Sequence, residues 1–220
     1  TLAVLALVVA GVAAAQGDTI RIATSLAQNS LAPGEATGLP DATVIRTMFE
    51  GLVGFQDGEL VNELAESWEA NEDATVYTFH LREGVTFHDG TPFDAQAVKD
   101  YYDWVMDESS VAARARGQLA AMESVEVVDD LTVNIHLSEP NGAFVFLLAT
   151  SNARIASPTS VREFGSDITR HPVGTGPFRF VSWTEGQNVI VERNPDYWGE
   201  PAQVERLEFV VVNNAATRVA

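Results

Sequence analysis

Residues 79–93 read FHLREGVTFHDGTPF and join a strand to a helix through two turns. Apolar and polar residues alternate over 75–82, which is typical of a half-buried strand. The Asp-Gly pair that follows is a turn sequence, since glycine accepts backbone angles that other residues avoid. Asp94 is a good N-cap for a helix over 95–106, because a carboxylate can accept hydrogen bonds from the first turn. The segment therefore predicts a strand, a turn and a helix in succession.

The same periodicities extend along the rest of the chain. Alternation predicts further strands at 20–23, 124–128, 131–137, 178–183, 188–192 and 206–212. Helical spacing predicts a helix that Asp41 caps and that ends near Gly51, and a short buried helix at 143–149. Strands and helices interleave with several hairpins, so the fold class is mixed α/β with partly antiparallel sheets.

The composition narrows the classes of partner. The 220 residues carry a formal net charge of −18, and Lys99 is the only lysine. Such a surface repels nucleic acid and anionic lipid, so neither is an expected partner. Salt adaptation and biased genomic composition both remain open as origins of this acidity.

The two ends of the sequence suggest a signal peptide and a helix that continues beyond the last residue. Residues 2–15 are apolar and too short to span a membrane, so 1–15 is interpreted as a partial signal peptide with Gln16 as the mature start. A buried core helix is the alternative. The chain contains no cysteine, which argues against a lipid anchor and excludes disulfides and thiolate metal sites. Residues 213–220 resemble the opening of a longer helix.

No pattern of catalytic or metal-binding residues stands out. The four histidines, His80, His88, His136 and His171, are at least eight residues apart, so no metal site is predicted. The Gly174–Gly176 run lacks the lysine of a phosphate-binding loop, and we interpret it as a tight backbone crossing. No catalytic residue is predicted, although a secreted hydrolase that uses an Asp/Glu pair remains an alternative.

Two segments are candidates for ligand binding. Ser25, Leu26 and Ala27 directly follow the first strand, and ligands of open α/β sheets bind beyond the carboxyl ends of strands. Ser151, Asn152 and Arg154 follow the apolar 143–149 segment, and an arginine there is suited to pair with a ligand carboxylate. A solvated helix end is the alternative for this second segment. The two segments are predicted to face one crevice.

Three separated stretches carry a family resemblance: 79–93, HPVGTGPFRF at 171–180 and NPDYWG at 194–199. Together they resemble the family 5 extracellular solute-binding proteins of ABC transporters, which bind peptides, opines and nickel complexes. The resemblance implies a periplasmic binding protein-like fold of class II with an extra N-terminal domain, here incomplete. It implies the following division: 16–50 and 173–220 as two segments of lobe I, 51–172 as the additional domain, and lobe II absent.

The resemblance also implies a function. The protein would be periplasmic, would bind a peptide-like ligand without chemistry, and would deliver it to ABC permease subunits as a monomer without a cofactor. Thr175 is expected to line the ligand cleft. A secreted structural or adhesion module is a further alternative.

Overall fold

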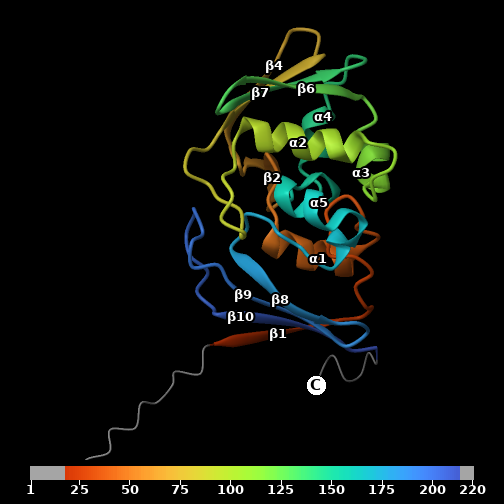
Figure 1. The fold of residues 1–220 in the computed structure, drawn as a ribbon, viewed down its shortest axis with the longest axis vertical. Coiled ribbons are helices and arrows are strands. Elements are labelled where there is room, and N and C mark those ends of the chain that lie inside the picture. Colours follow the sequence, from red (N-terminus) through yellow and green to blue (C-terminus); the bar gives the residue numbers. More distant parts are fainter. Residues whose placement is uncertain (1–17, 214–220) are drawn as a thin grey trace, which may run out of the picture.

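The structure, a computed structural model, describes residues 18–213 and contains two four-stranded sheets at opposite ends with helices between them (Figure 1). The predicted signal segment and residues 214–220 lie outside the described residues. Within the described range, no helix is long and apolar enough to span a membrane.

The lower sheet unites the two ends of the described chain. Its strand order is β1 (Thr19–Thr24), β10 (Arg206–Val211), β9 (Asn188–Arg193) and β8 (Phe178–Thr184). β1 pairs with β10 in parallel, whereas the other pairs are antiparallel. In Figure 1 the red first strand therefore lies beside the blue last strand, with α1 (Leu39–Met48) above the sheet. The predicted strands in this region are confirmed.

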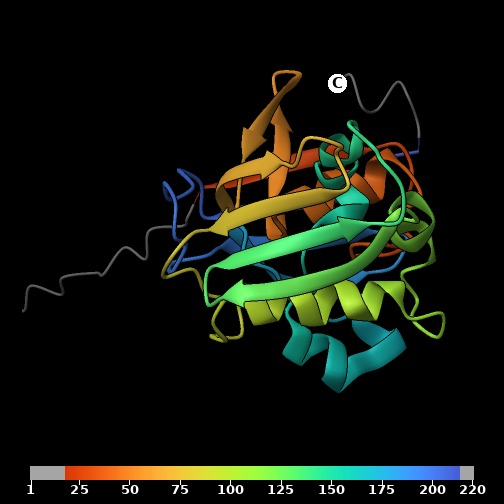
Figure 2. The ribbon, with the colours of Figure 1, turned by 90° about the horizontal axis from the view of Figure 1, so that it is seen from above.

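The upper sheet is antiparallel and is formed by the middle of the chain. Its order is β4 (Ala65–Ala70), β5 (Val76–Leu81), β7 (Thr132–Leu137) and β6 (Met122–Asp129). Tyr77 and Phe79 are buried, as the alternation predicts. The helix α2 (Ala95–Met106) packs against this sheet, and Figure 2 looks down onto the pair. Asp94 accepts a hydrogen bond from the Ala97 amide at 2.8 Å, which confirms the predicted N-cap.

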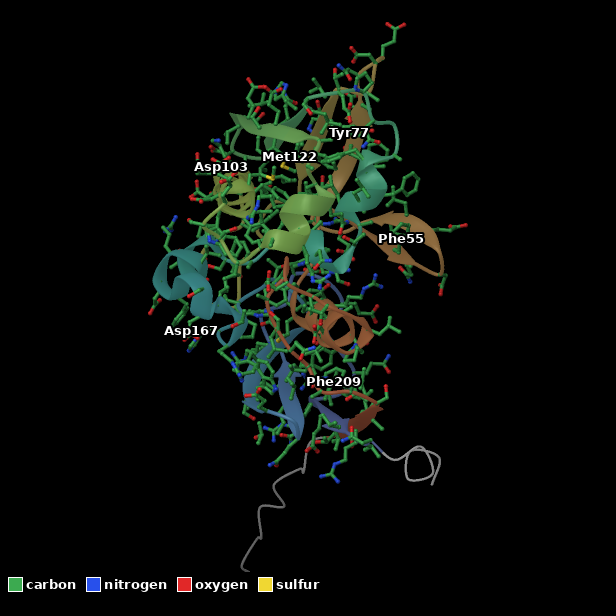
Figure 3. The ribbon with its side chains drawn as sticks, turned by 90° about the vertical axis from the view of Figure 1, so that its right-hand side faces the viewer. Phe55, Tyr77, Asp103, Met122, Asp167 and Phe209 are labelled. Atoms are coloured by element: carbon green, nitrogen blue, oxygen red, sulfur yellow. The ribbon has the colours of Figure 1, made fainter. Side chains whose placement is uncertain are left out.

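Smaller elements connect the two sheets. β2 (Val53–Gln56) and β3 (Glu59–Asn62) form a hairpin, marked by Phe55 in Figure 3, that stands out from the side of the molecule. The remaining helices are α3 (Ala113–Gln118), α4 (Phe144–Leu148) and α5 (Pro158–Phe164), with the 3₁₀ turns η1 (Ser151–Ala153) and η2 (Gly165–Thr169). The predicted apolar helix at 143–149 corresponds to α4.

The predicted bounds of α1 were wrong at both ends. The helix begins at Leu39, and Pro40 fits the first turn because its missing N–H has no helical partner to lose. Asp41 lies inside that turn rather than at the cap. The helix ends at Met48, before Gly51, because the chain then turns to contact residues further along. The Glu50 carbonyl, for example, accepts a hydrogen bond from the Ile155 amide at 2.9 Å.

The end of α1 is crossed at close range by the Gly174–Gly176 backbone. The Gly176 amide donates to the Met48 carbonyl at 2.9 Å. A Cβ added to Gly176 would lie 2.7 Å from the Met48 carbonyl carbon, and one added to Gly174 would collide with the same peptide. This geometry confirms the predicted backbone crossing, since no side chain fits between the two backbone segments.

We expect Gly176→Ala to destabilise the full-length protein by about 1–3 kcal/mol, because the new methyl group must displace backbone. Gly117→Ala is the matched control. It lies in α3 with nothing within 4 Å of an added Cβ, and should change stability little or raise it by up to about 1 kcal/mol. Urea unfolding measures both variants. Equal stability of Gly176→Ala and the wild type would contradict the close crossing.

Candidate functional site

A groove of about 440 Å³ lies at the carboxyl end of β1. The end of the strand and the loop after it form one wall, and the start of α1 forms the other. The lining residues are Ile22, Ala23, Thr24, Ser25, Leu26, Gly38, Leu39, Pro40 and Thr43. None of them is charged. The side chains of Leu26 and Leu39 are 64% and 84% exposed, so the groove offers apolar surface to a ligand.

A buried carboxylate holds the loop that forms this groove. Asp41, 1% exposed, accepts hydrogen bonds from the Asn29 amide at 2.8 Å and from the Thr37 amide and hydroxyl at 2.9 Å each. These bonds tie both parts of the 25–38 loop to the first turn of α1. The carboxylate in that turn also complements the positive end of the helix dipole. Asp41 therefore sets the shape of the groove without lining it.

The structure places Ser25 and Leu26 in the groove wall and leaves Ala27 half-buried beside it. The prediction that this segment contacts ligand stays a prediction, now with a groove of suitable size at its position. Neither Asn152 nor Arg154 lines the groove. Asn152 lies in η1, half-buried, and its Oδ1 is buried without a hydrogen-bond partner among the described residues. The two predicted segments therefore do not share this groove.

Arg154 has an internal partner. Its two terminal nitrogens contact the two carboxylate oxygens of Glu63 at 2.9 and 3.0 Å, and one of them also donates to the Phe49 carbonyl at 2.5 Å. The arginine is 4% exposed. This pairing argues against the prediction that Arg154 binds a ligand carboxylate. Glu63 was missed because nothing in its local sequence distinguishes it from the other carboxylates of an acidic chain.

Glu50 is the centre of a second buried cluster. Its carboxylate accepts hydrogen bonds from Thr175 at 2.8 Å, from the Tyr197 hydroxyl at 2.7 Å and from the Trp198 indole at 2.8 Å. Burial raises the pKa of Glu50, and the three donors oppose that rise. Thr175 is fully buried, which argues against its predicted place in the cleft wall. The NPDYWG aromatics here bind the protein's own carboxylate.

His88 also has structural partners. Its backbone amide donates to the Gly174 carbonyl at 2.8 Å, and its Nε2 lies 3.0 Å from the Gly176 carbonyl oxygen. Burial lowers the pKa of this histidine, which favours the neutral ring. The neighbouring Asp89 carboxylate accepts from the Ser157 hydroxyl at 2.6 Å. Thus the 79–93, 171–180 and 194–199 stretches meet at the end of α1 and build a framework rather than a reaction site.

We expect Arg154→Ala to destabilise the full-length protein by roughly 3–5 kcal/mol, because it leaves the Glu63 carboxylate without its partner. Arg162→Ala is the control: its side chain is 65% exposed and pairs with Asp100 at 3.2 Å at the surface. Loss of that pair should cost about 0–1 kcal/mol. Urea unfolding compares the two. Unchanged stability of Arg154→Ala together with weakened ligand binding would restore the sequence-based assignment.

Glu50 should make stability depend on pH. Because the folded pKa is raised above its ordinary value of 4.5, the folded protein binds more protons than the unfolded chain just above that pH. The contribution of Glu50 to stability is therefore greatest below pH 4.5 and falls as the pH rises through the raised pKa.

In Glu50→Gln this fall should disappear, while the amide oxygen still accepts from Thr175 and Trp198. We expect the unfolding free energy of the variant to increase relative to that of the wild type as the pH rises from about 4.5 to 8, measured on the full-length protein. Parallel curves would show that the carboxylate does not titrate differently on folding.

Comparison with known proteins identifies solute-binding proteins as relatives of this chain. The model of the family "Bacterial extracellular solute-binding proteins, family 5 Middle" matches residues 59–220. The glutathione-binding protein GsiB of Pectobacterium atrosepticum is 39% identical over 194 residues, which is 88% of this chain and 37% of that protein.

Two solved structures share the fold. The PBP AgaA of A. tumefaciens R10, in complex with agropinic acid, has a TM-score of 0.85 and 31% identity over 92% of this chain and 41% of that one. The periplasmic binding protein DppA of Helicobacter pylori, in complex with the peptide STSA, has a TM-score of 0.84 and 27% identity over 92% of this chain and 44% of that one. The chain spans less than half the length of these relatives.

Proposed function

Since this chain belongs to family 5 of the bacterial extracellular solute-binding proteins, we propose that the protein captures a peptide-like solute outside the cytoplasm and delivers it to an ABC importer. The groove at the carboxyl end of β1 is the observation that carries the proposal. It combines an uncharged lining, two exposed leucines and a loop held in shape by Asp41. A site of this kind binds a small organic solute.

The relatives favour a peptide-like ligand over the other classes. GsiB, the relative with 39% identity, is named for glutathione, which is a peptide, and DppA was solved with the peptide STSA. AgaA, with agropinic acid, shows that the same fold also accepts opines. We infer that Ser25, Leu26 and Ala27 contact the ligand, partly through backbone groups beyond the end of β1.

We further propose that binding proceeds without a chemical step. The carboxylates of Asp41, Glu50 and Glu63 all accept hydrogen bonds that hold the fold, and none of them lines the groove. In the proposed mechanism a second lobe closes over the groove by a hinge, and the closed form docks on a permease. The sheet topology supports 16–50 and 173–220 as one lobe, because β1 pairs with β10.

Calorimetric titration of the full-length protein with glutathione and a panel of di- to tetrapeptides tests this proposal. We expect saturable binding of at least one member, without turnover. Ser25→Trp should weaken that binding by about tenfold or more, which corresponds to at least 1.4 kcal/mol, because the indole fills the groove. Its melting temperature should stay near the wild-type value.

Val128→Trp is the matched control, since it introduces the same indole side chain at an exposed position of β6 in the other sheet. Its affinity should equal that of the wild type. Binding of an opine or a nickel chelate in place of every peptide would contradict the ligand class. Cleavage of a titrated peptide would favour the secreted hydrolase.

A further inference from the structure

The exposed face of α1 continues beyond the groove to a single positive charge. Leu39 and Thr43 line the groove, and Arg46 lies one turn further along the same helix. At 100° per residue, positions 39, 43 and 46 fall within about 60° of one another around the helix axis. Arg46 lies about 4.5 Å beyond Thr43 along that axis. Arg46 is exposed and does not itself line the groove; it lies next to the groove on the same face of α1.

The guanidinium of Arg46 is held in position and is only partly used. Its Nε donates to the Ser151 hydroxyl at 3.1 Å, and Ser151 is buried in η1. Within residues 18–213, Arg46 forms no ion pair, and its two terminal nitrogens make no hydrogen bond. Arg154, by contrast, uses both terminal nitrogens on Glu63. The two terminal nitrogens of Arg46 therefore stay available for a bidentate hydrogen bond to a carboxylate.

The positive charge of Arg46 matters because the protein as a whole is acidic. A net charge of −18 disfavours the approach of an anionic solute, and the described residues that line the groove supply no compensating cation. A peptide-like ligand nevertheless carries at least one carboxylate. An unpaired arginine at the end of an otherwise neutral groove attracts that group and fixes which way the ligand lies.

We propose that Arg46 binds a carboxylate of the ligand and makes the protein select free acids over neutral derivatives of the same solute. This inference rests on the proposed function and names the chemistry that the site recognises. It replaces Arg154 in the role that the sequence suggested for it. In this proposal η1 does not supply the binding arginine. It holds Arg46 in position through the hydrogen bond to Ser151.

The test compares matched ligands and matched variants. The tightest peptide of the panel is titrated into the full-length protein both as the free acid and as the C-terminal amide. For glutathione, the diester replaces the amide. We expect the wild type to prefer the acid by about tenfold or more. Arg46→Gln should lose that preference by weakening the acid alone, and Arg46→Lys should retain part of it because the charge remains.

Arg21→Gln controls for the change in net charge, since Arg21 is exposed on β1 and already pairs with Glu208 at 2.7 Å. It should leave both affinities unchanged. If Arg46→Gln weakens the affinity for the acid and for the amide equally, Arg46 has a structural role and the inference is overturned. Unchanged affinity of this variant for the acid would also overturn it. A wild-type protein that binds no peptide overturns the proposed function and this inference together.

Discussion

The close contact between the Gly174–Gly176 backbone and the end of α1 holds the two halves of the molecule together. Around it, Glu50 binds Thr175, Tyr197 and Trp198, while His88 contacts the carbonyl groups of Gly174 and Gly176. The upper sheet reaches this point through the His88 turn, and the lower sheet through the segment before β8. Together with the hydrophobic core that both sheets share, these buried polar contacts and the absence of two side chains set the orientation of one sheet relative to the other.

Local patterns predicted many elements of this fold, although not β2, β3, β4, α3 or α5, because the predicted elements depend on neighbours in sequence. Asp94 caps α2 through an amide three residues away, and the alternation in β5 follows from one buried face. The internal partners of Thr175 and Arg154 were not predicted. Their partners, Glu50 and Glu63, are 125 and 91 residues distant, and only the topology brings them together. Residue type alone does not distinguish a binding arginine from a structural one.

The structure separates two uses of charge. Asp41, Glu50 and the Arg154–Glu63 pair are buried or nearly buried and bind partners that belong to the fold, although the buried Nε of Arg154 has no hydrogen-bond partner among the described residues. The described residues of the groove wall are uncharged, and among the described residues the exposed side chain of Arg46, next to the groove on α1, has one hydrogen-bond partner, Ser151. Buried charges without partners are costly, which explains why these charged groups bind partners within the fold. A residue that is to bind a solute must instead keep part of its hydrogen-bonding capacity free.

The parallel pairing of β1 with β10 has a consequence for the order of assembly. Thr19 is paired with Arg206, and within the described residues β1 is an edge strand whose neighbour is β10. The upper sheet, in contrast, pairs strands that are closer in sequence than β1 and β10, although β5 and β7 are separated by residues 82–131. Contacts between distant residues form slowly, because a long loop must close first. We therefore expect the groove at the end of β1 to be completed late in folding, after the upper sheet, so that the proposed binding groove exists only when nearly all of this segment has folded.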